Sequence, residues 1–325
     1  MLADPSFLPA EDFAPKEGED AASALLLATG VRPDEPPLAH VLMHALQRGR
    51  TGADPLAGTT DASLAASAWA EGEANLVAIL YLFEGLGLEG GVLEKGLDPG
   101  QWLDGALLPA SLDVLPGVEA LFMDFVYREG YAQAVGAFRR SGWKGVDRSV
   151  AGRRTTRDLL HPDRPPLAVT AIADPPAPQG WTLADRDSLG EEGIVALVSI
   201  VSGKDNLGLM AGDGWAGDAL LRFEPQAGPA SREGLTIWLS RWISPEEAAD
   251  FEYGVERCLS ARFPGAALAP SGPHERRMAA GGKSFRLSRN GTEVVLKIAA
   301  ESADAPPAKT PTRHAPVRRK NNKSK

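Results

Sequence analysis

Two of the five histidines in this sequence, His40 and His44, stand four residues apart in the stretch PPLAHVLMHALQRG. On an α-helix, residues at this spacing project from the same side about 5 to 6 Å apart, so both imidazoles can reach one metal ion. Zinc peptidases use the spacing in the motif H-E-x-x-H, where the glutamate acts as general base. Here Val41 stands in that place. Either this is a zinc site without its base, or the two histidines bind no metal.

The residues around the pair predict which side of the helix faces the protein. A helix is expected over residues 37–48. One side of it carries an apolar stripe, made of Leu38, Leu42 and Leu46. The other side carries His40, His44 and Gln47. An amphipathic helix usually buries its apolar stripe, so the spacing alone favours a solvated pair of histidines on the helix surface.

A zinc site needs a third ligand, usually from another segment. The next expected helix, over residues 62–84 and capped by Asp61, contains the run WAEGEAN with Glu71 and Glu73. These two glutamates lie on nearly opposite faces, so only one can meet the histidines, and helical phase does not choose between them. Gly72 between them is costly inside a helix unless a neighbouring helix packs closely there.

Composition changes along the chain predict five segments. They are a poorly structured segment (1–35), a helical domain (36–163), a proline-rich linker (164–180), an α+β domain (181–302) and a disordered basic tail (303–325). Two further helices are expected in the helical domain, at 118–128 and 130–141. The fold class is therefore α+β, with a helical first part and then an α+β domain with a small antiparallel sheet.

Within the expected α+β domain, the pattern predicts alternating helices and strands. Helices are expected at 187–202 and 205–212, and another is opened by Ser244 and Pro245. Strands are expected at 219–224, 234–243, 276–287 and 292–299, the last two joined by the turn SRNGT.

Charge and composition exclude several classes of protein. The net charge of the 325 residues is −9, and the tail after Asp304 carries seven Lys or Arg without an acid, which leaves −16 on the rest. An acidic body argues against nucleic acid as a partner, and no apolar run is long enough to cross a membrane. The single cysteine, Cys258, is expected to pack rather than react. A protein or peptide remains the expected kind of partner, and the oligomeric state stays open.

Four stretches, in order, resemble a family of bacterial zinc metallopeptidases of the gluzincin type. These stretches are PLAHVLMHALQ, DASLAASAWAEGEANLV, SGWKGVDRSVAGRRTTRDLLHP and LMAGDGWAGDALLRF. The family typically shows AHELTHALQDQ, followed by a helix ending in LVEGDA. The likeness covers about residues 36–300 and implies a zincin-like helical domain that binds zinc.

Carried over position by position, the resemblance implies that His40, His44 and Glu71 are the zinc ligands. Glu73 matches the acidic place two residues later, which implies a supporting role behind the ligands. His161 and Asp218 fall within family motifs, and no chemistry is assigned to either. For Asp218 the simplest interpretation is a turn in which its side chain bonds nearby backbone.

Two departures from the family affect the predicted function. Val41 replaces the glutamate that would pass a proton from the zinc-bound water to the leaving amine, so no catalytic residue is assigned. Asp34 and Glu35 precede the helix, and Pro36 and Pro37 separate them from the place of the base.

The second departure is that residues 1–35 leave little room for the strands that zincins place before this helix. The sequence as it stands is expected in the cytoplasm, and export is the alternative if the chain begins further upstream.

Three functions therefore stay open. The first is a degenerate metallopeptidase without proteolytic activity that retains zinc, or has lost it, at His40, His44 and Glu71. The second is a metal-free binding or scaffold protein that uses the former substrate groove. The third is an active metal-dependent hydrolase with an unrecognised general base.

Overall fold

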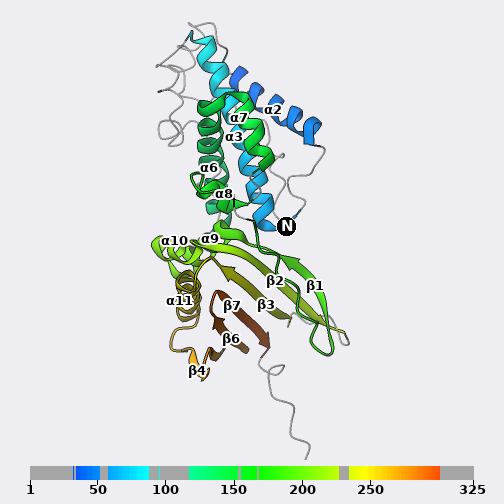
Figure 1. Cartoon of the computed structure of the whole chain (residues 1–325), viewed down its shortest axis with the longest axis vertical. Helices are drawn as coiled ribbons and strands as arrows, with labels where there is room; N and C mark the ends of the chain where they lie inside the picture. The colour runs from blue at the N-terminus through cyan, green and yellow to red at the C-terminus, as the bar shows by residue number, and fades with distance from the viewer. Residues whose placement is uncertain are drawn as a thin grey trace, which may run out of the picture.

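The computed structural model of the chain describes residues 32, 34–51, 58–87, 95, 117–152, 155–166, 168–226 and 234–300 (Figure 1). Residues 1–31 of the expected poorly structured segment and the whole expected basic tail lie outside the described residues. In the described part, helices come first, and an antiparallel sheet with further helices follows. The α+β prediction is confirmed.

The helical part is built around two long helices that pack side by side (Figure 1). Its elements are α2 (Glu35–Thr51), α3 (Thr60–Gly85), α6 (Val118–Ser141), α7 (Trp143–Gly152) and α8 (Thr156–Leu160). Helix α6 runs unbroken where two helices were expected. No helix among the described residues combines the length and hydrophobicity that a bilayer crossing requires.

Helices α3 and α6 cross in close contact at a pair of glycines. A Cβ atom on Gly72 would lie 2.0 Å from the carbonyl oxygen of Gly130, and one on Gly130 would lie 2.0 Å from that of Ala68. No side chain fits there, so the expectation that a neighbouring helix explains Gly72 is confirmed. Around the crossing, the apolar core contains Leu76, Tyr131 and other buried side chains.

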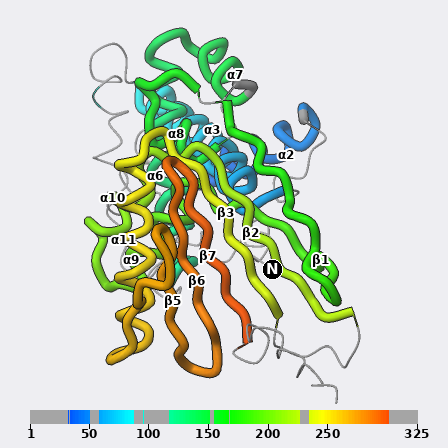
Figure 2. The backbone as a smooth tube through the Cα atoms, turned by 60° about the horizontal axis from the view of Figure 1, so that its bottom comes forward, coloured from blue at the N-terminus to red at the C-terminus, as the bar shows by residue number. Residues whose placement is uncertain are grey.

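The second part is a sheet with helices on one face (Figure 2). The sheet has seven antiparallel strands in the order β1-β2-β3-β7-β6-β5-β4. The strands are β1 (Trp181–Asp187), β2 (Trp215–Pro225), β3 (Leu235–Trp242), β4 (Ala269–Gly272), β5 (Glu275–Ala280), β6 (Lys283–Asn290) and β7 (Glu293–Ala300). The helices are α9 (Gly190–Ser202), α10 (Asp205–Gly212) and α11 (Pro245–Arg262). Trp238 and Trp242 of β3 pack against Phe251 of α11 in the main core.

Two strands were not expected from the sequence, and both lie at the edges of the sheet. Strand β1 is exposed along nearly its whole length, and all four residues of β4 are exposed. Such strands lack the apolar alternation that marks a half-buried strand. The segment expected as one strand at 276–287 is two strands, β5 and β6, joined by a turn at Gly281 and Gly282.

The two parts of the chain are joined at the start of α3. Thr59, and not Asp61, caps this helix, because its hydroxyl accepts a hydrogen bond from the amide of Ala62 at 3.3 Å. The buried Asp61 side chain instead accepts hydrogen bonds from the amide and hydroxyl of Thr156, at 2.9 and 2.6 Å. Its backbone amide donates to the carbonyl of Ser188, at 2.9 Å. The predicted capping role of Asp61 is therefore wrong.

The proline-rich segment follows α8 and forms neither a helix nor a strand between residues 168 and 180. It lies against the sheet, since the amide of Thr170 donates to the carbonyl of Ala216 at 2.9 Å. Ile172 packs on the apolar face of the sheet that contains Leu221 and Phe223. This segment therefore contributes a layer over the sheet face opposite the helices.

Candidate metal centre

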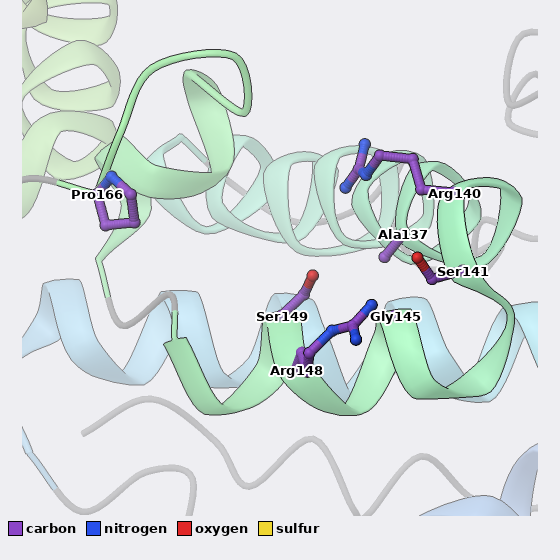
Figure 3. Close-up of a pocket in the computed structure, with 7 residues that line it drawn as sticks. All are labelled: Ala137, Arg140, Ser141, Gly145, Arg148, Ser149 and Pro166. Carbon is purple, nitrogen blue, oxygen red and sulfur yellow. The ribbon is translucent and has the colours of Figure 1, made fainter.

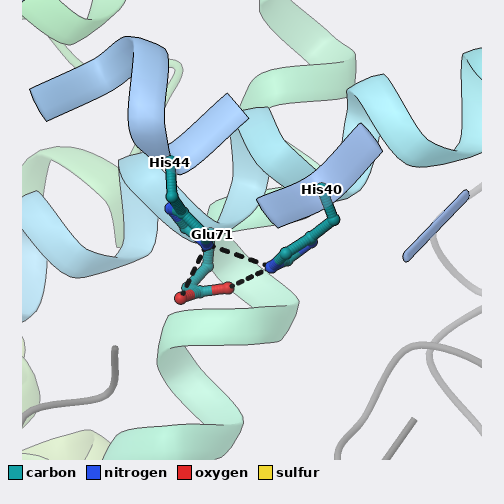
Figure 4. A group of neighbouring side chains, drawn as sticks. All are labelled: His40, His44 and Glu71. Atoms are coloured by element: carbon teal, nitrogen blue, oxygen red, sulfur yellow. Dashed lines mark hydrogen bonds and ion pairs between the residues drawn. The ribbon is translucent and has the colours of Figure 1, made fainter. Parts of the chain in front are cut away.

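The two histidines of α2 and one glutamate of α3 converge on one point (Figure 4). The Nε2 atoms of His40 and His44 lie 3.0 Å apart. One carboxylate oxygen of Glu71 lies 3.4 Å from Nε2 of His40, and the other lies 3.4 Å from Nε2 of His44. The structure thus brings together the three residues that the resemblance implied as zinc ligands.

The individual separations between these atoms are close to those between neighbouring ligands of a metal ion. Ligands held about 2.0 to 2.1 Å from a tetrahedral zinc ion lie roughly 3.3 to 3.4 Å from one another. The two imidazole nitrogens lie 3.0 Å apart, and each lies 3.4 Å from a different oxygen of Glu71. One ligand atom from each of the three residues lies within 4.8 Å of the other two. Two imidazoles and a carboxylate are also a ligand set that zinc accepts. The residues present therefore fit zinc.

Helix α2 is oriented with its polar side toward α3, the reverse of what its apolar stripe predicted. The side chains of His40 and His44 are 16% and 27% exposed. The leucines of the stripe are more than half exposed, Leu38 at 54%, Leu42 at 55% and Leu46 at 63%. The prediction of a solvated histidine pair opposite a buried stripe is wrong, because polar contacts with α3 decide the orientation of this helix.

A chain of hydrogen bonds holds His44 in place. Its Nδ1 atom lies 2.9 Å from Oε1 of Gln47, an acceptor, so Nδ1 carries the proton in the neutral ring and Nε2 is left with its lone pair. The amide nitrogen of Gln47 donates to the carbonyl of Ala70 and to Glu73, both at 2.9 Å. This arrangement presents the Nε2 lone pair of His44 toward Glu71.

Glu73 lies behind the ligands rather than among them. Its carboxylate accepts hydrogen bonds from Nη2 of Arg50 at 2.8 and 2.6 Å, as well as from Gln47. Arg50 also reaches Asp147 of α7, at 3.2 Å. Sequence reasoning assigned Glu73 a supporting place but did not single out Arg50 or the role of Gln47. The sequence did contain a signal for the role of Gln47, because it is a polar residue three positions after His44 and therefore on the same side of the helix.

When no metal ion lies between them, imidazole N–H groups directed at Glu71 stabilise its charge. Burial raises the pKa of this carboxyl, but contacts with His40 and His44 outweigh burial and lower the pKa to about 2. Burial lowers the pKa of His44, and the Glu71 carboxylate outweighs that effect and raises it. Oε2 of Glu71 is buried, and although it lies 3.4 Å from Nε2 of His40, no described residue donates a well-aligned hydrogen bond to it. A bound cation would satisfy such an oxygen.

The position of the missing general base carries an exposed apolar side chain. Val41 is 54% exposed. Within the described part of the chain, Glu71 is the carboxylate in contact with the two imidazoles. Asp34 and Glu35 instead hydrogen-bond with Arg32. None of these groups is placed to shuttle a proton as a peptidase glutamate does.

His161 lies in a second group of possible ligands, at the boundary between the two parts of the chain. Its Nε2 atom is 2.7 Å from Glu191 and 3.8 Å from Asp213. Burial raises the pKa of Glu191 to about 8 and lowers that of His161, so both groups favour their uncharged forms. Asp213 is already paired with Arg164, at 3.1 Å. This group fits a metal less well than the first.

Asp218 has a structural role that differs from the expected turn. It lies in β2 and is buried. Its carboxylate accepts hydrogen bonds from the amides of Leu189 and Gly190 at the start of α9, at 3.0 and 3.2 Å. The indole nitrogens of Trp215 and Trp238 also donate to it, both at 3.0 Å. Asp218 therefore fixes the start of α9 on the sheet, and the prediction that it bonds its own turn is wrong.

Cys258 is partly buried in α11 and packs against the main core. Burial raises the pKa of its thiol to about 11, so the reactive thiolate is scarce at neutral pH. This agrees with the packing role predicted from the sequence.

Comparison with known proteins reaches only the second part of the chain. Residues 181–308 match the family described as Domain of unknown function (DUF8575). No curated protein and no solved structure matches the chain. The matched segment contains the sheet and helices α9 to α11, and it does not include His40, His44 or Glu71.

Proposed function

We propose that the chain is a zincin-like protein that binds one zinc ion through His40, His44 and Glu71 and has no peptidase activity. The observation that carries the proposal is the convergence of two imidazoles and one carboxylate, whose ligand atoms lie within 4.8 Å of one another, on a ligand set that zinc accepts. The resemblance of the surrounding stretches to zinc metallopeptidases supports the choice of zinc over other cations.

A bound zinc ion would supply positive charge that can polarise a carbonyl group and lower the pKa of a water molecule. Peptide hydrolysis also needs a group that accepts a proton and returns it to the leaving amine. The side chain of Val41 can do neither. The chain's own residues therefore support holding the ion, with Glu71 and the imidazoles as ligands and Gln47 as the group that orients His44.

The metal would hold α2 against α3. Met43 is a buried apolar residue of α2. Burying one methionine side chain contributes about 1.5 to 3 kcal/mol to the free energy of folding. Structural zinc in zinc-finger peptides has an apparent binding free energy of about 10 to 16 kcal/mol at pH 7. Because the leucine stripe of α2 contributes little burial, zinc would be the larger of the two contributions to its attachment.

Elemental analysis of purified protein tests the proposal. His40→Ala should lose the zinc, while His274→Ala should retain it, because His274 is an exposed histidine before β5. The wild-type protein and the His274 variant should each contain about one zinc ion per chain. The proposal fails if wild-type protein contains no zinc above the buffer, or if His40→Ala keeps the wild-type amount.

Thermal unfolding with a chelator separates this proposal from the metal-free alternative. A chelator should lower the melting temperature of the wild-type protein and leave that of His40→Ala unchanged. Equal melting temperatures with and without chelator, together with absent zinc, would favour the alternative.

A metal-free binding protein is the second candidate, and one observation favours it. The outward side of α2 exposes apolar side chains, namely those of Leu38, Val41, Leu42 and Leu46. Exposed apolar stripes on helices are used to bind protein or peptide partners. The two candidates differ in whether α2 keeps its place without a metal ion.

A further inference from the structure

A cavity of about 280 Å³ opens between the end of α6 and helix α7 (Figure 3). Arg140 and Ser141 line it from α6, and Arg148 and Ser149 line it from α7. In Figure 3 the guanidinium group of Arg148 and the hydroxyl group of Ser149 extend from α7 toward α6, while the side chain of Arg140 runs back along α6. Side-chain hydrogen-bond donors from two helices thus line the cavity, together with Ala137, Gly145 and Pro166.

The two arginines have no carboxylate partner among the described residues. Other exposed arginines are paired, such as Arg164 with Asp213 at 3.1 Å and Arg186 with Asp174 at 2.9 Å. Both arginines line one cavity of a chain that has 43 acidic residues against 34 Lys and Arg. The positive charge at this cavity is therefore not neutralised by the described part of the protein.

The segment that carries the cavity residues is rich in positive charge. Residues 139–154 contain six Lys or Arg and one acid, in a chain whose net charge is −9. The acid, Asp147, pairs with Arg50 at 3.2 Å and is not one of the cavity residues. A basic surface within an acidic molecule attracts a small anion without attracting large polyanions to the whole protein.

The helices that carry these donors are held together firmly. Val146 of α7 is fully buried against the core of α3 and α6. Phe138 and Trp143 contact each other edge to face across the bend between α6 and α7, with ring centroids 5.2 Å apart. The arginines and serines therefore extend from a fixed pair of helices, which reduces the entropy that a ligand must overcome.

We infer that this cavity binds a phosphate-type oxyanion, either free or as the phosphoryl group of a small molecule. A guanidinium group can donate two parallel N–H hydrogen bonds to two oxygens of such an anion, and serine hydroxyls can donate to its other oxygens. The volume lies just below the roughly 300 to 1,000 Å³ of pockets that enclose drug-sized ligands, so the ligand is small. The inference does not depend on the metal centre.

Thermal unfolding in inorganic phosphate, at constant ionic strength set with chloride, tests the inference. The wild-type melting temperature should rise and saturate with phosphate concentration. The double variant Arg140→Gln/Arg148→Gln should weaken the apparent affinity by about 10-fold or more. Lys144→Gln/Lys283→Gln, which removes two exposed charges outside the cavity, should keep the wild-type affinity.

The comparison between variants is the deciding readout, because phosphate also stabilises proteins without binding to a site. Equal rises in melting temperature for the two double variants, or a rise that never saturates in wild-type protein, would overturn the inference. Circular dichroism without phosphate checks that both variants fold. Repeating the titration with glycerol 3-phosphate distinguishes the sources, since tighter binding than inorganic phosphate indicates a phosphorylated small molecule and equal or weaker binding indicates the free ion.

Discussion

Nδ1 of His44 lies 2.9 Å from Oε1 of Gln47, and this contact determines which nitrogen of the ring faces Glu71. Gln47 is itself held by Ala70 and Glu73, so the orientation of the imidazole is fixed from the side away from Glu71. Metal-binding histidines in proteins are commonly oriented in this way by a second hydrogen bond.

Removing the side chain of Gln47 should therefore weaken zinc binding without removing a ligand. We expect Gln47→Ala to lower the zinc affinity about 10- to 100-fold, measured by competition with a chromophoric chelator. Leu46→Ala, a change at an exposed uncharged residue of the same helix, is the matched control and should leave the affinity unchanged. An unaltered affinity in Gln47→Ala would show that this contact does not position the ligand.

Restoring the general base should give weak proteolysis if zinc is held. We expect zinc-loaded Val41→Glu to hydrolyse an unfolded protein substrate slowly, and a chelator to stop the reaction. Val41→Gln has nearly the same shape but cannot carry the proton, so it should remain inactive. If the glutamate variant is no faster than the glutamine variant, the site lacks more than its base.

The contact between Gly72 and Gly130 predicts a severe packing defect. A methyl group on Gly72 would lie 2.0 Å from the carbonyl oxygen of Gly130, which requires the helices to separate next to Glu71. We expect Gly72→Ala to lower the free energy of unfolding by about 3 kcal/mol or more, measured by urea denaturation. Gly49→Ala, where no atom lies within 4 Å of the new methyl group, should be neutral or stabilising by up to about 1 kcal/mol. Equal effects of the two substitutions would contradict the close crossing.

Asp61 predicts a dependence of stability on pH. Burial raises its pKa from 3.8 to about 6, so the folded state binds this proton more tightly than the unfolded state. The stability from this carboxyl is complete below about pH 4 and is lost as the pH rises through about 6, with a total of about 3 kcal/mol. Asp61→Asn keeps an acceptor for Thr156 and stays uncharged.

Urea denaturation from pH 4 to 8, with chelator present, measures this effect as a difference between the two proteins. The variant should gain stability relative to wild type between pH 4 and 6, and the difference should stay constant above pH 7. A difference that does not change with pH would mean that Asp61 titrates normally in the folded protein.

The residues of the candidate site could be predicted from the sequence, whereas the helix orientation and contacts that position them could not. The spacing of His40 and His44 identified the pair, but only the resemblance selected Glu71 over Glu73, because two residues on opposite faces of a helix cannot be ranked without a partner helix. The orientation of α2 was not predictable from its leucine stripe, since hydrogen bonds of Gln47 and Arg50 to α3 outweigh apolar burial there.

The α+β layout followed from sequence periodicity, whereas the edges of the sheet and the boundary between the two parts did not. Strand β1 is exposed and carries no alternation to detect. Asp61 was a reasonable helix cap by local rules, yet its partner Thr156 is far along the chain. Contacts between residues far apart in the sequence cannot be predicted from the local sequence pattern.

X-ray absorption at the zinc edge of purified wild-type protein tests the central claim most directly. We predict about one zinc ion per chain, with nitrogen and oxygen ligands at about 2.0 to 2.1 Å and the outer-shell scattering of two imidazoles. Protein that contains no zinc, or zinc without two imidazole ligands, would contradict this account of the site.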